Sequence, residues 1–571
     1  MSRTHYCGEV NFFHIGAHVI ISGWIHSIRR LKNLTFLDIR DRTGIIQAVC
    51  SKKLFPSIFL QSLKLNQEFC IRISGKVREK RKKISESVLQ KNIEVLVHSI
   101  NILNNSKNLP IDIIGRKISS EEMQLKYRYL YLRNPDMNKT LVIRSEITHF
   151  IHQFMHKNKF VNIETPYLSN PTDGGAKDFL VPSRTKHNHY YALAQSPQMF
   201  KQILMISGFD RYYQIAKCFR DEDSRSNRQP EFTQLDMEMS FVNSKKIKKI
   251  IERFIRKLWK KILKYDLPNC FPTITFEDAI QKYGTDKPDL RNPLELVDIT
   301  YLTSSFDKSE RKFSNEDSCI LIHIKQVLRD IKSIQFKKYQ RLSLKFKIKN
   351  FLILEFSSDF LNQTVKKNLL DFPVEFFYSI RSNFQIKEGD VICVGIGKKP
   401  LLNQFMGCLR SNLAKELDIS EKNVWKPIWV IDFPMFKEEK DGCLKPVHHV
   451  FTSPKLCDIS KLYSNPIRTV SDSYDMVING QELGSGSVRI YKKEIQEKIF
   501  QILKINEEDQ KNRFGFFLEA MQYGVPPHAG FAFGLDRIVM LMLNQKNIKN
   551  VIAFPKTTSA SCLMTNSPSK I

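Results

Sequence analysis

A cluster of alternating charges, Arg220-Asp221-Glu222-Asp223, lies between two apolar, strand-like runs of this chain. The runs are Tyr212 to Phe219 and Glu231 to Phe241. Two strands joined by such a loop can hold an arginine against a phosphate and a carboxylate against a nucleotide or a metal ion. Charge runs also mark solvated hairpin tips. The flanks favour a ligand site, because charged and polar groups gather there beside an aromatic residue: Gln198, Lys201, Gln229, Phe232 and Asp236.

A second group of candidate side chains follows the pattern D-x6-E-L-G-S-G-S-V-R, which runs from Asp475 to Arg489. Asp475 and Glu482 suit Mg²⁺ shared with phosphates, since this hard cation prefers oxygen ligands. Gly484 and Gly486 permit close approach of a ligand to the backbone. Arg489 can form a bidentate pair with a carboxylate. The segment therefore predicts a place where a metal, phosphates and a carboxylate meet.

Paired histidines, His448 and His449, lie in a predicted loop. No cysteine or third ligand stands at metal spacing, so substrate contact or a structural role is favoured over zinc. The 11 cysteines include no C-x-x-C pair, which indicates reduced thiols in a cytoplasm.

Composition bounds the class of protein. A length of 571 residues predicts several domains. With 42% hydrophobic residues, no long apolar run and no signal-peptide pattern at Met1 to Val10, the sequence predicts a soluble, unexported, cytoplasmic protein without a membrane segment. The net charge of +30 favours a polyanionic partner. An AT-rich genome would also enrich lysine, so the charge is supporting evidence only.

The elements that must position these groups begin with residues 1 to 110, which read as all-β. Their five short β-branched or aromatic runs predict an OB-type barrel, a fold that commonly binds single-stranded nucleic acid. Phe36 offers a stacking ring, with Arg29, Arg30 and Gln47 near it in sequence for phosphate and base contacts. The alternation alone equally allows Phe36 to be a core residue.

Farther along, apolar spacing from Ile143 predicts an amphipathic helix that leads into Ile163-Glu164-Thr165-Pro166. The segment Ile247 to Leu263 predicts a second helix, packed on the core with a solvated lysine face; membrane-surface binding is the alternative. Residues 291 to 424 are dense in phenylalanine and lysine. Their Gly395-Ile396-Gly397-Lys398 run is too weak to predict a phosphate loop.

Three of these segments together resemble one family. FRDEDSRSNRQPEFTQLD, from Phe219 to Asp236, resembles motif 2 of class II aminoacyl-tRNA synthetases. Gly534 to Met540, GLDRIVM, is similar to motif 3, and Ile163 to Pro166 is similar to the end of motif 1. Order and spacing agree along nearly the whole chain, and the bacterial aspartyl type is the nearest match. The resemblance implies ATP-dependent attachment of L-aspartate to tRNA(Asp), through an aspartyl-adenylate and transfer to the terminal ribose.

The resemblance also implies an α+β multidomain fold: the OB-type barrel, a catalytic domain built on an antiparallel sheet with flanking helices, and an α/β insertion domain. The implied domains are 1–110 for anticodon binding, 111–139 as linker, 140–290 and 425–571 as the catalytic domain, and 291–424 as the bacterial insertion. Gly407-Cys408-Leu409-Arg410 matches the last insertion helix. The implied partners are tRNA(Asp), ATP, L-aspartate, Mg²⁺ rather than zinc, and a second copy in a homodimer through motif 1.

Residue roles are carried over by position. Arg220 and Arg537 are the implied catalytic residues, and Asp475 and Glu482 the implied metal ligands. The implied aspartate-binding residues are Gly174, Gln198, Lys201, Arg220, Asp236, His448 and Arg489. The implied ATP-binding residues are Arg220, Asp221, Glu222, Gln229, Phe232, Glu482, Gly534, Leu535, Asp536 and Arg537. The implied anticodon contacts are Arg29, Phe36, Gln47 and Glu94.

Two departures from the family pattern stand out. Ser27-Ile28-Arg29 replaces three consecutive basic residues, which predicts that the barrel binds the phosphates of its nucleic acid more weakly. Gly174 replaces a loop glutamate that closes over the amino acid's ammonium group, and we expect Asp173 to substitute in part.

Three other functions fit these residues and domains less well than attachment of aspartate to tRNA. An asparaginyl enzyme has less use for both Lys201 and Arg489, an ammonia-dependent asparagine synthetase lacks the N-terminal barrel, and a non-catalytic paralogue is expected to lose Arg220 or Arg537.

Overall fold

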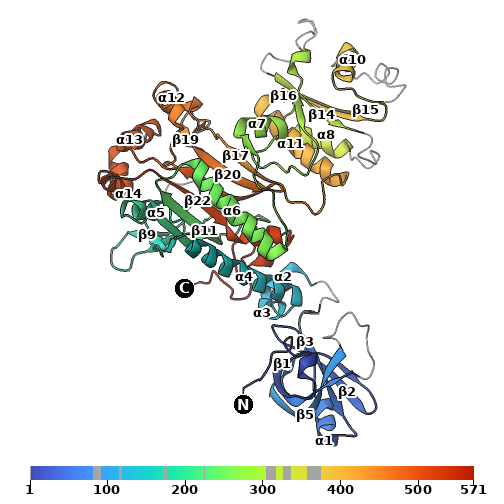
Figure 1. Cartoon of the computed structure of the whole chain (residues 1–571). Helices are drawn as coiled ribbons and strands as arrows, with labels where there is room; N and C mark the ends of the chain where they lie inside the picture. The colour runs from blue at the N-terminus through green and yellow to red at the C-terminus, as the bar shows by residue number, and fades with distance from the viewer. Residues whose placement is uncertain are drawn as a thin grey trace. The chain divides into compact units, whose positions relative to one another are not determined.

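The computed structural model describes residues 2–80, 92–114, 119–171, 176–223, 225–303, 317–325, 336–356 and 374–570. The chain divides into two compact units (Figure 1). One contains Met1–Lys139 together with Cys562–Ile571, and the other contains Thr140–Ser561. The last ten residues, which the sequence places with the catalytic domain, thus group with the N-terminal unit.

The N-terminal unit is built on a closed five-stranded barrel in the order β1-β2-β3-β5-β4. Alternate apolar residues such as Leu37 and Ile39 fill its interior. This arrangement confirms the predicted OB-type barrel. The strands are β1 (His18–Arg30), β2 (Leu34–Arg40), β3 (Ile45–Ser51), β4 (Cys70–Glu79) and β5 (Ile93–Asn104), with helix α1 (Pro56–Leu63) between β3 and β4.

The predicted linker contains two short helices, α2 (Glu121–Lys126) and α3 (Arg128–Tyr131). The side chain of Ser120 caps α2 by accepting a hydrogen bond from the Met123 backbone. Leu130 packs with Ile111 and Ile113 in a small apolar cluster. The linker is therefore a packed element rather than an extended tether.

The larger unit is organised by an eight-stranded sheet in the order β12-β17-β20-β21-β22-β11-β10-β6. Its inner pairs are antiparallel, as predicted, whereas the outermost pairs β12/β17 and β6/β10 are parallel. The strands are β6 (Val161–Asn162), β10 (Arg211–Phe219), β11 (Glu231–Ser240), β12 (Thr273–Thr275), β17 (Pro427–Ile431), β20 (Ser473–Ile478), β21 (Gln481–Val488) and β22 (His528–Gly534).

The strand order brings distant motifs together. β11 pairs with β22 so that Gln234 lies opposite Gly534, and β22 also pairs with β21. The charged loop after β10, the Asp475–Arg489 segment and the start of the helix after Gly534 therefore share one region of the sheet. This strand pairing is the physical reason that the loop after β10 can form one site with two segments that follow it by more than 200 residues.

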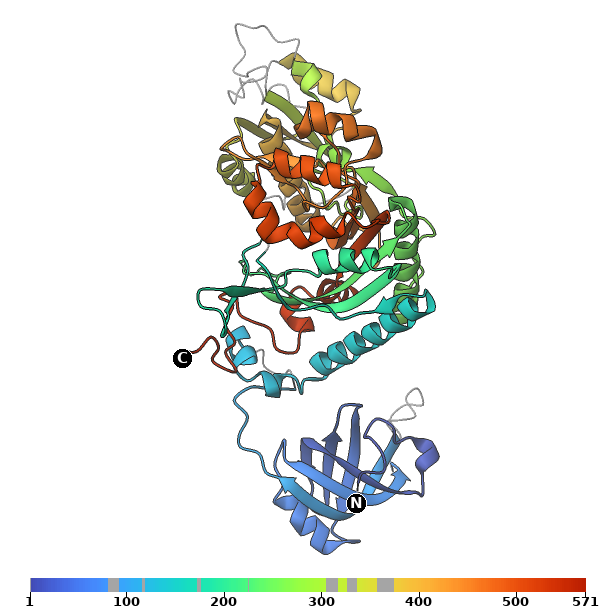
Figure 2. The ribbon, with the colours of Figure 1, turned by 90° about the vertical axis from the view of Figure 1, so that its left-hand side faces the viewer.

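Helices cover one face of this sheet (Figure 2). They are α4 (Pro135–Lys157), α6 (Ser244–Leu263) and α15 (Leu535–Met542). Ile247, Ile251 and Phe254 of α6 are fully buried in the main core, which confirms the predicted core-packed helix. A search of the described residues finds no helix with the length and apolarity needed to cross a membrane.

The insertion is an antiparallel sheet in the order β13-β14-β16-β15, with apolar clusters on both faces. Gly395 and Gly397 lie within strand β16 and pair with β14, so this run is no phosphate loop. The elements are β13 (Leu296–Asp298), β14 (Asp317–Ile324), β15 (Asn350–Glu355), β16 (Val391–Lys398), α8 (Phe336–Lys345), α10 (Val374–Asn383) and α11 (Lys399–Glu416).

Smaller elements complete the larger unit. Strands β7 (Leu168–Ser169), β8 (Leu180–Pro182) and β9 (Tyr190–Leu193) form a three-stranded sheet, and β18 (Phe436–Glu438) pairs with β19 (Leu444–Pro446). An aromatic-rich cluster joins α5 to α13 and α14 through side chains that include Met199, Phe500 and Phe514. The remaining helices are α5 (Gln198–Ile206), α7 (Phe276–Tyr283), α12 (Ile459–Ser464), α13 (Lys493–Ile502) and α14 (Glu507–Ala520).

Candidate active site

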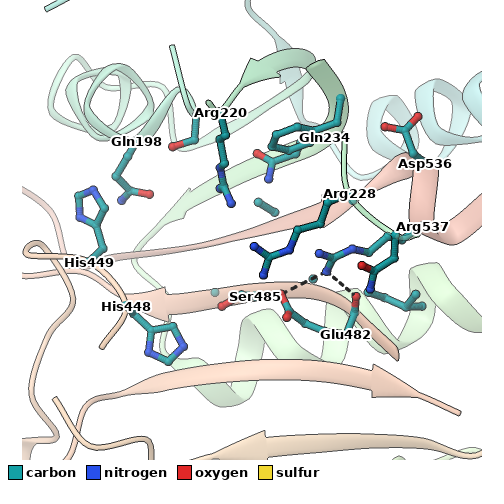
Figure 3. Close-up of a pocket in the computed structure, with 18 of the residues that line it drawn as sticks. Gln198, Arg220, Arg228, Gln234, His448, His449, Glu482, Ser485, Asp536 and Arg537 are labelled. Carbon is teal, nitrogen blue, oxygen red and sulfur yellow. Dashed lines mark hydrogen bonds and ion pairs between the residues drawn. The ribbon is translucent and has the colours of Figure 1, made fainter. Parts of the chain in front are cut away.

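A cavity of about 390 Å³ opens over strands β11, β21 and β22. Charged and polar side chains line it from strands β11 and β21 and from four further segments: α5, the β10–β11 loop, the His448–Thr452 loop, and the junction of β22 with α15 (Figure 3). Of the predicted residues, the lining contains Gln198, Lys201, Arg220, Glu222, Gln229, Phe232, His448, Glu482, Arg489, Gly534, Asp536 and Arg537. The structure thus collects most of the predicted aspartate and ATP residues in one place.

Arg220 follows β10 directly and is fixed by its backbone, whose N–H donates to the Pro230 carbonyl at 2.9 Å. Its guanidinium carbon lies 5.2 Å from the centre of the Phe232 ring. Among the described residues its Nε finds no hydrogen-bond partner, although it is buried. Figure 3 shows Arg220 and Gln198 extending into the cavity. A positioned cation with an unused donor is suited to binding a phosphate or a carboxylate.

Four buried charges form the floor of the cavity around strand β11. Lys201 Nζ lies 2.6 Å from Asp236 Oδ1 and 3.5 Å from Glu238 Oε2. Arg489 Nε lies 2.9 Å from Glu238 Oε1, and its Nη1 donates to Ser487 Oγ at 2.7 Å. Burial raises the pKa of Asp236, whereas Arg489 and Lys201 outweigh burial and lower the pKa of Glu238.

This cluster corrects the predicted cationic pocket. Lys201 and Arg489 are already paired with Asp236 and Glu238, so the buried charges balance without a ligand. An uncharged substrate would therefore not leave these cations unpaired, so their presence alone does not argue against an asparaginyl enzyme. Selection of a carboxylate must instead depend on the N–H donors that the two cations still direct at the cavity.

The two histidines differ in environment. His448 Nε2 lies 3.7 Å from Asp475 Oδ1, and its ring packs edge-on against Phe433. Burial, together with the positive charges of Arg489 and Lys201, lowers the pKa of His449 to about 3. His449 is therefore neutral at physiological pH and acts in the site as a polar group without charge.

Asp475 and Glu482 lie on neighbouring strands β20 and β21. Asp475 is buried, and its Oδ1 has no hydrogen-bond partner among the described residues. Glu482 Oε2 lies 2.8 Å from Lys287 Nζ, and its Oε1 lies 3.6 Å from Arg537 Nη1. Two carboxylates, one with an unused oxygen, fit a hard divalent cation. Among the described residues, no three or more histidine, cysteine or acidic side chains are placed so that they could hold a metal ion together, so further ligands would have to come from phosphate or water.

Several predicted residues have other partners. The Gln229 amide donates to the Lys556 carbonyl at 3.2 Å and accepts from the Lys556 N–H at 2.7 Å, so both its polar atoms are used by the backbone. Asp536 accepts from the Thr233 N–H at 2.8 Å and pairs with Arg144 at 2.6 Å. Both side chains hold the cavity wall together, and a direct nucleotide contact of either residue stays a prediction.

Four further predicted residues are not part of the cavity lining: Leu535, Asp221, Asp236 and Asp475. The side chain of Leu535 is buried in the main core, so only its backbone can face a ligand. Asp221 is exposed, and its backbone pairs with Lys177 instead. Asp236 lies beneath the lining and reaches the cavity through Lys201. Gly174, with the neighbouring Asp173, is outside the described residues.

Sequence reasoning missed three charged residues of the site. Arg228 lines the cavity and pairs with Glu222 at 2.6 Å. Glu238 could have been found, because the two-residue period of β11 puts it on the same face as Asp236. Lys287 stands in a loop between α7 and β13, and nothing in its local pattern distinguishes it from a solvated lysine.

The predicted anticodon contacts gather on one face of the barrel. Arg29 lies opposite Phe36 across β1 and β2, with its guanidinium carbon 4.8 Å from the ring centre. Phe36 is half-buried rather than part of the barrel core. Gln47 lies two residues from the Phe36 partner Val49, and Glu94 is held by Arg78 at 2.7 Å. An aromatic ring beside a cation is suited to base stacking.

Comparison with known proteins agrees with this geometry. A family model described as tRNA synthetases class II (D, K and N) matches residues 120–558, and one described as an OB-fold nucleic acid binding domain matches residues 19–103. Among solved structures, asparaginyl-tRNA synthetase from Pyrococcus horikoshii, complexed with asparaginyl-adenylate, superposes with a TM-score of 0.61 at 18% identity, over 98% of this chain and 99% of that one. Aspartyl tRNA synthetase from Entamoeba histolytica gives a TM-score of 0.57 at 18% identity, over 97% and 91%.

Fold and site thus define a class II tRNA synthetase of the D, K and N group. Two curated relatives from Buchnera aphidicola, both named "Aspartate--tRNA ligase", are each 45% identical to this chain and align with all of it. The alignment covers 97% of the relative from the Schizaphis graminum subspecies and 99% of that from the Baizongia pistaciae subspecies. Within the class, the chain belongs to the aspartate--tRNA ligase family.

Proposed function

We propose that this enzyme attaches L-aspartate to tRNA(Asp) in two ATP-dependent steps. The observation that carries the proposal is the meeting in one cavity of Arg220, which forms no ion pair among the described residues, with the buried Lys201 and Arg489 and the carboxylate Glu482. These groups match the three charged parts of the reactants: the α-carboxylate, the side-chain carboxylate and the triphosphate.

The first step forms aspartyl-adenylate. An oxygen of the aspartate α-carboxylate attacks the α-phosphorus, and the bond to the bridging oxygen breaks so that pyrophosphate leaves with its electrons. No proton is removed from the nucleophile, so no general base is needed. Arg220 neutralises the two approaching anions, and Arg537 binds the outer phosphates. Mg²⁺ held by Asp475 and Glu482 would neutralise further phosphate charge when bound.

The second step transfers the aspartyl group. A hydroxyl of the terminal ribose attacks the acyl carbon and passes its proton to the leaving phosphate, while AMP leaves with the electrons of the broken acyl–phosphate bond. Arg220 remains beside the leaving phosphate in this step. Phe232 and Arg537 offer an aromatic face and a guanidinium plane between which adenine can stack, and both line the cavity.

Recognition of aspartate uses the remaining lining groups. Lys201, Arg489 and His448 direct N–H donors at the side-chain carboxylate. Gln198, whose Nε2 lacks a partner among the described residues, binds the ammonium end of the substrate through its other amide atom, supported by Asp236. Asparagine is rejected because its amide N–H₂ would face the donors of Lys201 and Arg489.

Gly530→Ala should weaken aspartate binding. A Cβ at this position would lie 1.8 Å from Glu238 Oε2 and 2.7 Å from Arg489 Nη2, so the pair must shift. Because small misplacements of a binding group are costly, the KM for aspartate should rise on the order of tenfold to a hundredfold. Steady-state pyrophosphate exchange measures it. Gly515→Ala is the control, since only Lys511 Cγ at 3.9 Å is near its Cβ; equal KM values in both variants would contradict the assigned pocket.

Phe36→Ala should weaken tRNA binding and leave adenylate formation unchanged, since the barrel contacts only the anticodon. Loss of one base stack costs about 1 to 3 kcal/mol. Filter binding of tRNA(Asp) measures the affinity. Phe55→Ala is the matched control, because it removes a half-buried ring that is tilted against His98 with the ring centres 4.9 Å apart. Unchanged tRNA affinity in Phe36→Ala would remove this residue from the anticodon site.

The finer assignments of partners are also proposed. The enzyme is a cytoplasmic homodimer without membrane attachment that uses Mg²⁺ and no zinc. The dimer is supported by β6, an edge strand of the large sheet, and by exposed apolar side chains nearby: Val161, Tyr167, Leu168 and Leu180. Sedimentation equilibrium tests it, and a monomer at micromolar concentration would contradict it.

Aminoacylation tests the whole reaction. With ATP, labelled aspartate and a tRNA(Asp) transcript, the purified enzyme should give acid-precipitable aspartyl-tRNA. Formation of free asparagine from aspartate and ammonia, without charged tRNA, would instead identify an amide-forming enzyme.

A further inference from the structure

Lys287 contacts the predicted metal and phosphate site from outside the set of residues that the family resemblance assigns. Its Nζ lies 2.8 Å from Glu482 Oε2, and Glu482 lines the cavity. The same carboxylate also faces Arg537 at 3.6 Å. Without a ligand, two cations therefore share one carboxylate of the site. When a metal ion binds the Glu482 carboxylate, Lys287 and Arg537 become available to bind another anion.

The segment that carries Lys287 is held rigidly. Gly284, at the end of α7, lies so close to Gly407 of α11 that a Cβ on either residue would come within about 2.5 Å of the other's backbone. Arg410 of α11 is buried and donates to the carbonyls of Asp289, Asn292 and Leu294. The insertion thus anchors the segment on one side.

The other side of the segment rests on the catalytic sheet. Asp289 forms two hydrogen bonds with Arg291, at 3.0 and 2.7 Å, and its Cβ is 3.1 Å from the position of a Cβ on Gly480. Gly480 is in the turn between β20 and β21, the strands of Asp475 and Glu482. The backbone at Lys287 is therefore fixed relative to the two carboxylates.

Stability does not account for this placement. The Lys287 side chain is 37% exposed, and ion pairs of that exposure contribute little to folding. A lysine aimed at a cavity carboxylate does alter the local field, which decides how polyphosphate and metal bind. Its flexible stem also lets the ammonium group move a few ångströms without disturbing the segment.

We propose that Lys287 is a further ATP-site residue, which rests on the proposed function. In the metal-free enzyme its ammonium group forms an ion pair with the Glu482 carboxylate, and it therefore competes with the metal ion for this ligand. When the metal and ATP bind, the ammonium group leaves Glu482 and pairs with the triphosphate. Lys287 thus keeps the site neutral before binding and adds a positive charge to the polyphosphate afterwards.

Two titrations of the Lys287→Met variant test the competition with the metal ion and the contact with the triphosphate. Binding of Mn²⁺ alone to the metal-free protein, followed by electron paramagnetic resonance, should tighten severalfold or more because the competitor is gone. ATP affinity with saturating Mg²⁺, followed by calorimetry, should fall about tenfold to a hundredfold, the scale of one charge-assisted hydrogen bond. Lys287→Arg retains the charge and should restore most of the ATP affinity.

Lys455→Met is the matched control, because Lys455 forms an ion pair with Asp432 whose exposure, 31% and 24%, is similar to the 37% and 23% of the Lys287–Glu482 pair. It should change neither titration. The proposal fails if Lys287→Met matches this control in ATP affinity or in Mn²⁺ affinity, whatever its melting temperature. Both readouts are binding measurements, so failure of the proposed function would show separately, as wild-type enzyme that binds ATP but does not activate aspartate.

Discussion

Arg489→Ala should lower the affinity for aspartate by more than an order of magnitude while leaving ATP binding nearly unchanged. Arg489 is buried, and its guanidinium is bonded to Glu238 at 2.9 and 3.2 Å and to Ser487 at 2.7 Å. Truncation removes the donor for the substrate carboxylate and also leaves Glu238 buried without its main partner. Loss of one member of such a pair costs roughly 2 to 5 kcal/mol.

Aspartate affinity is measured by calorimetry with a non-hydrolysable ATP analogue present. Arg211→Ala is a suitable control, because Arg211 belongs to the same sheet and its side chain donates to the Asn158 carbonyl at 2.7 Å, away from the cavity lining. ATP binding by Arg489→Ala confirms that the variant is folded. Near-normal aspartate affinity in a folded Arg489→Ala variant would overturn the assigned specificity pocket.

Arg220→Ala should slow adenylate formation by about 10² to 10³, the loss seen when one preorganised transition-state donor is removed. Among the described residues its guanidinium forms no ion pair and its Nε has no hydrogen-bond partner, so truncation breaks no ion pair with that part of the chain. Folding should therefore be little affected. The effect should appear in the single-turnover rate at saturating aspartate and ATP, because the charge that Arg220 neutralises develops most fully as the two anions meet.

Two companion variants sharpen the test. Arg220→Lys keeps the charge but loses the fork of donors, so it should recover only part of the rate. Arg228→Ala removes a neighbouring, more exposed arginine whose side chain is paired with Glu222 at 2.6 Å, and it should cost less than Arg220→Ala. An unchanged single-turnover rate in Arg220→Ala would exclude this residue from the chemistry.

The elements that the sequence predicted are those with a strong local signal. The barrel strands and α6 each show apolar residues at a fixed period, and the structure buries those residues. The motif residues were found through a family resemblance, and pairing of β11 with β22 explains why they meet. Strand pairing between segments about 300 residues apart leaves no local pattern, so the geometry of the site required the structure.

The differences between the contacts that the sequence predicted and those that the structure shows have a common physical cause. Gln229 and Asp536 lie in motif segments, yet long-range partners, the Lys556 backbone and Arg144, occupy their polar atoms. Lys287 was missed for the converse reason, since its role arises only from its contact with Glu482. Residue type and spacing indicate what a side chain can bind. They do not reveal which neighbouring group is its partner in the folded protein.

Amino-acid-dependent exchange of pyrophosphate into ATP tests the central claim most directly, because it isolates the activation step from tRNA. Purified enzyme with Mg²⁺ is assayed separately with aspartate, asparagine, lysine and glutamate. The structure predicts rapid exchange with aspartate and at most a small fraction of that rate with the others, since the donors of Lys201 and Arg489 face the side chain of the substrate. Exchange that is equal or faster with asparagine, or absent with aspartate, would contradict the account.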